Sequence, residues 1–172
     1  MNVIDRVNKM SKSNFISIFG NIFEKTDWIA KKAYTLKPFN NSKELFSKFM
    51  EIFENTSTKN HLKILNSHPE LAVEKKLTKD SKNEQNSANL NECSDQEFKE
   101  FKYLNKKYKK KFKFPFIIAV KGKNKNQILE NFKERIKNNY ELEFREAKNQ
   151  VKKIAKIRLQ QIKINKKLGG FS

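Results

Sequence analysis

His68 is the residue of this sequence with the clearest capacity for proton chemistry. It directly precedes Pro69 and follows a segment with helical apolar spacing, so we expect its ring at a helix terminus. A histidine has a reference pKa of roughly 6.5 and can therefore accept and donate protons near neutrality. Histidines in such settings are more often structural or surface residues, so the position alone leaves both interpretations open.

Arg158 falls on the apolar face of the last expected helix, seven residues after Val151. Burying an unpaired guanidinium is costly, so this side chain needs a carboxylate, carbonyl groups or an anionic ligand. An internal ion pair, or a rim position with a solvated head, is the structural interpretation; a ligand-binding arginine is the functional one. Glu84 and Gln85 could mark only the start of a helix. These residue types are compatible with a His, Glu and Arg pocket for a small anion.

The elements that must position these residues are predicted to be helices. Apolar residues recur three and four apart in most windows and strict alternation is almost absent, which predicts an all-α, single-domain bundle of about seven to nine helices. Phe116–Val120 suits a buried extended strand but has no second such run to pair with, so we expect an extended connector. The helices are expected at 15–23 behind N-cap Ser13, 27–37, 42–54, 57–67, 94–113, 126–136 behind N-cap Asn126, and 139–165.

The segment from Glu74 to Asn89 has two interpretations. It contains a single large aliphatic residue, Leu77, and could be a linker. Ser81 stands three residues before Glu84, which is the spacing of a capping box, so a helix starting near Ser81 is equally plausible. One domain is expected over residues 1–172, with a flexible tail at 166–172.

Composition excludes several classes of protein. The 172 residues contain one cysteine, Cys93, and two histidines, which are too few soft ligands for a disulfide framework or a structural zinc site. The N-terminus lacks an apolar segment of signal-peptide length, and no apolar run approaches the length of a membrane span. We therefore expect a soluble cytoplasmic protein.

The net charge of +19 does not by itself indicate a nucleic-acid-binding protein. The 38 basic residues are 34 Lys and 4 Arg, spread along the chain, whereas nucleic-acid-binding proteins concentrate positive charge and use arginine for bidentate contacts. One dense lysine cluster at 106–113 is interleaved with Tyr108 and Phe112. A solvated helix face is its commoner meaning, and a non-catalytic module that binds nucleic acid or anions is the alternative. A field this positive should attract small anions.

Several strings in order along the chain resemble one family, the decarboxylases of 2-oxo-4-hydroxy-4-carboxy-5-ureidoimidazoline (OHCU), which form (S)-allantoin in urate degradation. The resemblance covers nearly the whole chain. Its central string is Ser67-His68-Pro69-Glu70-Leu71-Ala72. The others are Thr26-Asp27-Trp28-Ile29-Ala30, Lys37-Pro38-Phe39, Leu77-Thr78, Ser81-x-x-Glu84-Gln85, Asn105-x-x-Tyr108, Lys111-Phe112-x-Phe114-Pro115 continuing to Gly122, and Ile154-Ala155-x-x-Arg158-Leu159.

The resemblance implies an all-helical enzyme, commonly a homodimer, that decarboxylates a small anionic substrate without metal or organic cofactor. It implies no membrane, makes nucleic acid an unlikely ligand, and places hydroxyisourate hydrolase and urate oxidase as pathway neighbours without a stable complex. His68 and Glu84 correspond to catalytic positions of the family. The substrate-binding positions correspond to Pro69, Ser81, Gln85, Phe116, Ile117, Ile118, Ala119, Val120 and Arg158.

Two positions depart from the family pattern. Lys113 stands where a glycine is usual, and Asn89 stands where Ala-Gly-Leu is usual. Asparagine tolerates left-handed backbone geometry, so Asn89 is a mild change, whereas Lys113 is strained if its site needs a positive φ.

Overall fold

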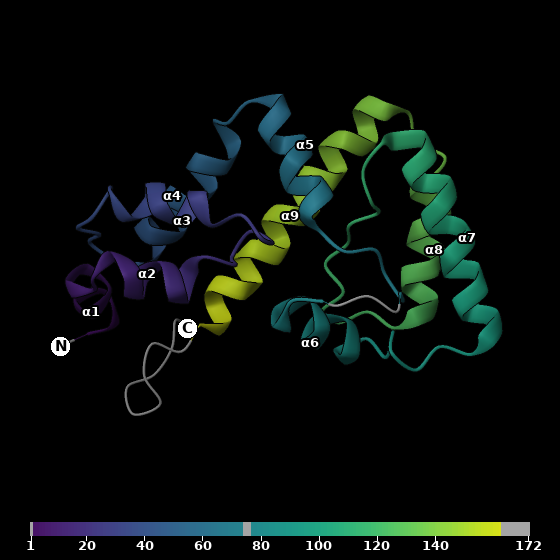
Figure 1. Ribbon diagram of the computed structural model, residues 1–172, viewed down its shortest axis with the longest axis horizontal. Coiled ribbons are helices and arrows are strands. Elements are labelled where there is room, and N and C mark those ends of the chain that lie inside the picture. The colour runs from purple at the N-terminus through teal and green to yellow at the C-terminus, as the bar shows by residue number, and fades with distance from the viewer. Residues whose placement is uncertain (1, 74–76, 163–172) are drawn as a thin grey trace. The chain divides into compact units, whose positions relative to one another are not determined.

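The computed structural model describes residues 2–73 and 77–162, which confirm the all-α fold (Figure 1). Within these ranges there are nine helices and no strand. Contacts divide the chain into two compact units, one containing residues up to Ile64 and the end of the last helix from Lys152, and the other containing Leu65–Val151. The helices are α1 (Val3–Lys9), α2 (Lys12–Phe19), α3 (Asp27–Tyr34), α4 (Ser42–Glu54), α5 (Thr58–Ser67), α6 (Lys79–Ser87), α7 (Asp95–Phe112), α8 (Lys125–Arg135) and α9 (Tyr140–Gln161).

The first unit is built on phenylalanines from α2 and α4. The rings of Phe15 and Phe19 both pack on Phe49, and Phe23 stacks on Phe53 with ring centroids 5.0 Å apart. α2 begins behind Ser11, so the expected N-cap at Ser13 is wrong. α2 also ends at Phe19, and the buried Ile22 and Phe23 lie beyond its end.

The second unit has its own aromatic core around α7. Tyr108 lies against Phe112, Phe114, Phe116 and Phe132, and it is fully buried. The Phe116 and Phe132 rings stack with centroids 3.9 Å apart. This stacking fixes the connector Phe116–Val120 against α8. As expected, the connector is neither helix nor strand.

The uncertain middle segment forms a helix, α6, but one turn earlier than the capping-box spacing predicts. Thr78 is the N-cap, and its hydroxyl oxygen accepts the Ser81 N–H at 3.3 Å. The helix expected near Ser81 is therefore present, but its N-cap is Thr78, and Ser81 already lies inside the helix. α8 likewise begins behind Asn124 rather than Asn126. The capping box of Ser94 and Glu97 is present at the start of α7.

Both residues that replace usual glycines adopt left-handed backbone. Lys113 caps the C-terminus of α7 with φ +65°, and Asn89 has φ +57°. A lysine in this conformation carries a steric cost that glycine would avoid.

No helix of the described ranges is both long enough and apolar enough to span a membrane. The expected tail at 166–172 and the expected end of α9 near Asn165 lie outside the described residues.

Candidate functional site

His68 lies immediately after α5, as its position before Pro69 predicts. Its backbone N–H donates to the Leu65 carbonyl at 3.2 Å, and the residue is 7% exposed. Pro69 is half-buried beside it. The ring is therefore held at a helix terminus, within the second unit, rather than on an exposed loop. His61, in contrast, lies in the first unit and is bonded through Nε2 to the Phe53 carbonyl oxygen at 2.7 Å.

The three predicted site residues of α6 share one helix face. Ser81 and Gln85 are buried and Glu84 is half-buried. The residues on the other side of the helix, Lys82, Asn83 and Asn86, are exposed. Positions three and four apart lie side by side on a helix, so this face carries a hydroxyl, a carboxyl group and an amide together.

Gln85 connects this face to the loop that follows His68. Its Oε1 accepts the Ala72 N–H at 3.1 Å, and its Nε2 donates to the Glu70 carbonyl at 3.2 Å. Asn105 of α7 donates from Nδ2 to the Leu71 carbonyl at 2.9 Å. Two side chains thus hold three consecutive loop residues, and Ala72 is kept at φ +51°. Backbone strain of this kind persists only where surrounding contacts enforce it.

Two cavities border the same loop, and Val73 lines both. One cavity, of about 510 Å³, is lined by Ala72 and Gln85 and extends to Cys93 and Phe98. The other, of about 390 Å³, is lined by Glu70, Asn105 and four lysines of α7, which are Lys102, Lys106, Lys109 and Lys110. Four ammonium groups against one carboxylate favour an anion near this surface.

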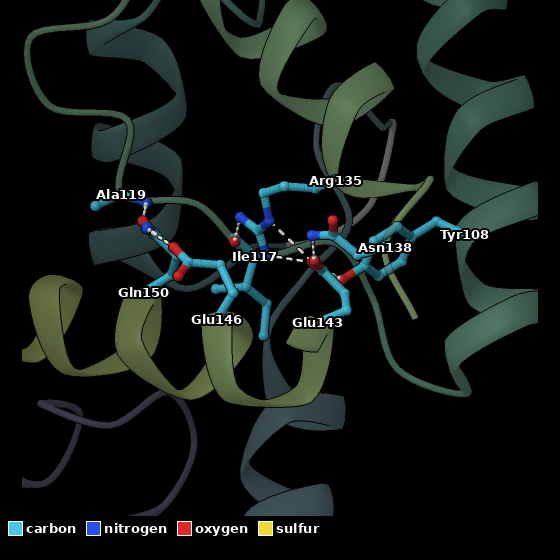
Figure 2. A network of polar contacts seen from close by, with 8 residues as sticks. All are labelled: Tyr108, Ile117, Ala119, Arg135, Asn138, Glu143, Glu146 and Gln150. Atoms are coloured by element: carbon cyan, nitrogen blue, oxygen red, sulfur yellow. Dashed lines mark hydrogen bonds and ion pairs between the residues drawn. The ribbon is translucent and has the colours of Figure 1, made fainter. Parts of the chain in front are cut away.

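The predicted substrate wall, Phe116–Val120, is buried throughout, with its five residues between 1% and 7% exposed. A buried ion pair lies behind it. Glu143 Oε1 accepts Arg135 Nε at 2.9 Å and Nη2 at 2.6 Å, and it also accepts the hydroxyl of Tyr108 (Figure 2). Burial and the adjacent Glu143 carboxylate raise the pKa of Tyr108 far above its ordinary value, so the phenol remains a hydrogen-bond donor.

Arg158 lies in the first unit and has a carboxylate partner there. Its Nη2 is 2.8 Å from Glu24 Oε2, and its Nη1 donates to the Asn21 carbonyl at 2.8 Å. The side chains of Arg158 and Glu24 are 4% and 1% exposed. The internal ion pair left open by the sequence is therefore present, and the substrate-binding role of Arg158 stays a prediction.

Four buried polar residues that hold predicted site residues or their neighbours in place were not predicted from the sequence. Glu24, Arg135, Glu143 and Gln150 are all buried and polar, and none of them was singled out. For Arg135 a signal existed, because it is one of only four arginines in the chain. Among the described residues, no three His, Cys, Asp or Glu side chains are grouped so that they could hold a metal ion.

The second unit contains both the buried His68 and the polar face of α6. General acid–base catalysis needs a histidine placed by its backbone and neighbours, with limited water around it. His68 is buried at the end of α5, and Gln85 holds the loop that follows it.

Comparisons with known proteins agree with these features. The family model for OHCU decarboxylase matches residues 8–160. The chain is 42% identical over 159 residues to the uric acid degradation bifunctional protein of Bacillus sp. (strain TB-90), covering 92% of this chain and 32% of that protein. It therefore spans about a third of that relative's length.

Other relatives match over nearly their whole length. The 2-oxo-4-hydroxy-4-carboxy-5-ureidoimidazoline decarboxylase of Haloferax volcanii is 34% identical over 156 residues, which cover 91% of this chain and 93% of that protein. A crystal structure of OHCU decarboxylase in the presence of (S)-allantoin aligns with a TM-score of 0.69 and 26% identity, covering 82% of this chain and 94% of that one. With a family model matching most of its length and full-length relatives above 30% identity, this chain belongs to the OHCU decarboxylase family.

Proposed function

We propose that this protein decarboxylates 2-oxo-4-hydroxy-4-carboxy-5-ureidoimidazoline to (S)-allantoin and CO2, as a step of urate degradation. The observation that carries the proposal is the family match over residues 8–160. The names of the Bacillus and Haloferax relatives support the pathway and the substrate. Urate oxidase and hydroxyisourate hydrolase are then the enzymes whose chemistry supplies the substrate. The proposal includes no stable complex between these enzymes and this protein.

The reaction needs a place for electrons and a source of one proton. The bond to the carboxylate breaks, its electron pair moves into the conjugated C–N and C–O groups of the ring, and CO2 leaves. A proton then adds to one face of a ring carbon, which sets the S configuration. Because the substrate's own ring accepts the electrons, the proposal requires no cofactor.

His68 is the proposed general acid and base. Its burial after α5 limits access of water, and an imidazole can hold or release a proton near neutral pH. Glu84 is proposed to orient His68 or to accept N–H groups of the ureido arm. Pro69, Ser81 and Gln85 complete the recognition of the substrate from the same unit.

The remaining roles concern binding. The connector Phe116–Val120 is proposed as the wall that excludes water and contacts the substrate through its backbone. Arg158 is proposed to pair with carboxylate or carbonyl oxygens of the substrate. A homodimer in the cytoplasm is the state we propose for the working enzyme.

A chirality assay tests the proposal. Urate oxidase and hydroxyisourate hydrolase generate the unstable substrate from urate, and circular dichroism follows allantoin with and without this protein. We expect a faster appearance of the S form. An unchanged, slow and racemic course would reject the function, and steep salt-dependent binding to DNA with no acceleration would favour the anion-binding alternative.

A further inference from the structure

The backbone N–H and C=O groups of the connector Phe116–Val120 need hydrogen-bond partners. The connector is buried, yet the described chain forms no strand that could pair with its backbone. Buried N–H and C=O groups need partners, so side chains or a ligand must supply them.

Three side chains supply partners to the connector: Arg135 and Gln150 on either side of Ile118, and Lys123, whose Nζ donates to the Ala119 carbonyl at 3.2 Å. Arg135 Nη1 donates to the Ile117 carbonyl at 2.7 Å, and Gln150 Oε1 accepts the Ala119 N–H at 2.9 Å (Figure 2). Arg135 is the last residue of α8, and Gln150 lies in α9. The connector is thus anchored on either side of Ile118 by two different helices.

Both anchors are themselves held in place. Two nitrogens of Arg135 contact Glu143 Oε1, and the guanidinium lies 4.4 Å from the centre of the Phe116 ring. Gln150 Nε2 donates to Glu146 Oε1 at 2.6 Å, which fixes which end of the amide faces Ala119. Rotation of either side chain would break these contacts, so the anchors are rigid.

Peptide planarity transmits this anchoring to Ile118. The Ile117 carbonyl and the Ile118 N–H belong to one planar trans peptide and point in opposite directions. The Ile118 carbonyl and the Ala119 N–H are related in the same way. With Arg135 and Gln150 holding the outer groups, the Ile118 N–H and C=O must face away from these anchors.

Ile118 therefore presents one donor and one acceptor in fixed directions. The residue is 5% exposed, and no hydrogen bond joins its N–H or C=O to any other residue of the described ranges. Leaving both groups unsatisfied in a buried site is costly, so a bound ligand with a complementary donor and acceptor would be favoured.

We propose that Arg135 and Gln150 are positioning residues that aim the Ile118 N–H and C=O at the amide or ureido groups of the substrate. This inference rests on the proposed function and adds to it the residues that set the geometry of the backbone contact. Glu143 and Glu146 act one step further back, by holding Arg135 and Gln150.

The test compares two variants at Gln150. Gln150→Met removes the acceptor for Ala119 N–H, and we expect kcat/KM to fall about 10- to 100-fold, as small losses of alignment do. The double variant Glu146→Gln with Gln150→Glu exchanges the two side chains and keeps both the acceptor and the internal hydrogen bond. We expect the exchange to restore kcat/KM to within about threefold of the wild type. Equal activity of Gln150→Met and wild type, or equal losses in both variants at matched melting temperatures, would overturn the inference.

A second measurement follows the binding of (S)-allantoin directly. In the wild-type protein, the amide resonance of Ile118 should shift on titration with (S)-allantoin, and in Gln150→Met the shift should shrink or the ligand should bind at least about tenfold more weakly. An Ile118 resonance that stays unchanged at saturation would contradict the inference. Failure of the proposed function would give a different result from failure of this inference, because the wild-type protein would then not accelerate formation of (S)-allantoin.

Discussion

At the scale of single residues, the buried ion pair of Arg158 and Glu24 sets what the arginine can do. Two nitrogens of the guanidinium already donate hydrogen bonds. Nη2 contacts the Glu24 carboxylate at 2.8 Å, and Nη1 donates to the Asn21 carbonyl at 2.8 Å. A guanidinium carries five donors in a fixed fork, so its planar geometry can serve several oxygens at once.

We predict that Arg158→Lys raises KM about tenfold, since an ammonium cannot satisfy Glu24, Asn21 and a substrate oxygen in the same geometry. Steady-state kinetics measure this. Glu24→Gln is the control, because it alters the ion pair without removing the guanidinium. If Arg158→Lys left KM unchanged and both variants only lowered the free energy of unfolding, the arginine would be purely structural.

Lys113 offers a prediction about stability. Because its φ is +65°, Lys113→Gly should raise the free energy of unfolding by about 0.5–1 kcal/mol. Asn89→Gly is the matched control, with φ +57° and a residue that tolerates this geometry, and its effect should be near zero. Denaturant unfolding measures both variants. A gain at Asn89 as large as that at Lys113 would show that backbone strain is not the cause.

The sequence indicated His68, Gln85 and Arg158 but could not indicate their partners. Glu24 lies between α2 and α3, outside any helical pattern, and its ion pair joins residues 134 positions apart. Spacing along a chain reports only local neighbours, so such a pairing has no local signal. Position and spacing singled out His68 and Arg158 as unusual, and the resemblance to a family assigned roles to the site residues.

At the scale of elements, the loop after His68 depends on α6 and α7. Gln85 and Asn105 donate to or accept from three consecutive residues of this loop. The backbone of residues 70–72, which directly follows His68 and Pro69, is therefore held by side chains on two helices.

We predict that Gln85→Met lowers kcat about 10- to 100-fold, because the loop after His68 loses two hydrogen bonds and the ring shifts. Unfolding free energy should also fall by about 1–3 kcal/mol. Asn83→Met is the control, since Asn83 is exposed on the same helix. Equal kcat for these two variants would show that the loop does not position the catalytic ring.

Helix existence was predictable from the sequence, but helix ends were less so. The period of apolar residues predicted α4, α7 and the core of α9 within a few residues. The N-cap errors at Ser13, Ser81 and Asn126 share a cause. Each lies two or three residues after another Ser, Thr or Asn that can cap equally well, and only the packed structure selects between them. The short helix α1 was not predicted.

At the scale of the whole molecule, the net charge of +19 should act on the approach of an anionic substrate. Four lysines line a cavity that borders the loop after His68, so the local field near the proposed site is also positive. Salt screens such fields over about 10 Å at 0.1 M ionic strength.

We predict that kcat/KM falls at least about threefold between low ionic strength and 0.3 M salt, while kcat changes little. Stopped-flow or coupled assays at several NaCl concentrations measure this. The double variant Lys106→Gln with Lys110→Gln should flatten the dependence. A kcat/KM that is independent of salt would show that the lysines do not steer the substrate.

The all-α class was predictable because apolar periodicity is a property of the whole chain. The assembly of the buried polar network was not, because Tyr108, Arg135 and Glu143 come from three helices and meet only after folding (Figure 2). Burying the charges of Arg135 and Glu143 costs desolvation free energy, so an argument from stability alone does not predict this ion pair.

In the proposed mechanism, His68 supplies the proton that turns the decarboxylated ring into (S)-allantoin. The rate of (S)-allantoin formation by His68→Ala, followed by circular dichroism with freshly generated substrate, measures this contribution. We predict a rate at least about 10²-fold below wild type, with an unchanged melting temperature and retained binding of (S)-allantoin. A folded His68→Ala protein that forms (S)-allantoin at the wild-type rate would contradict the claim.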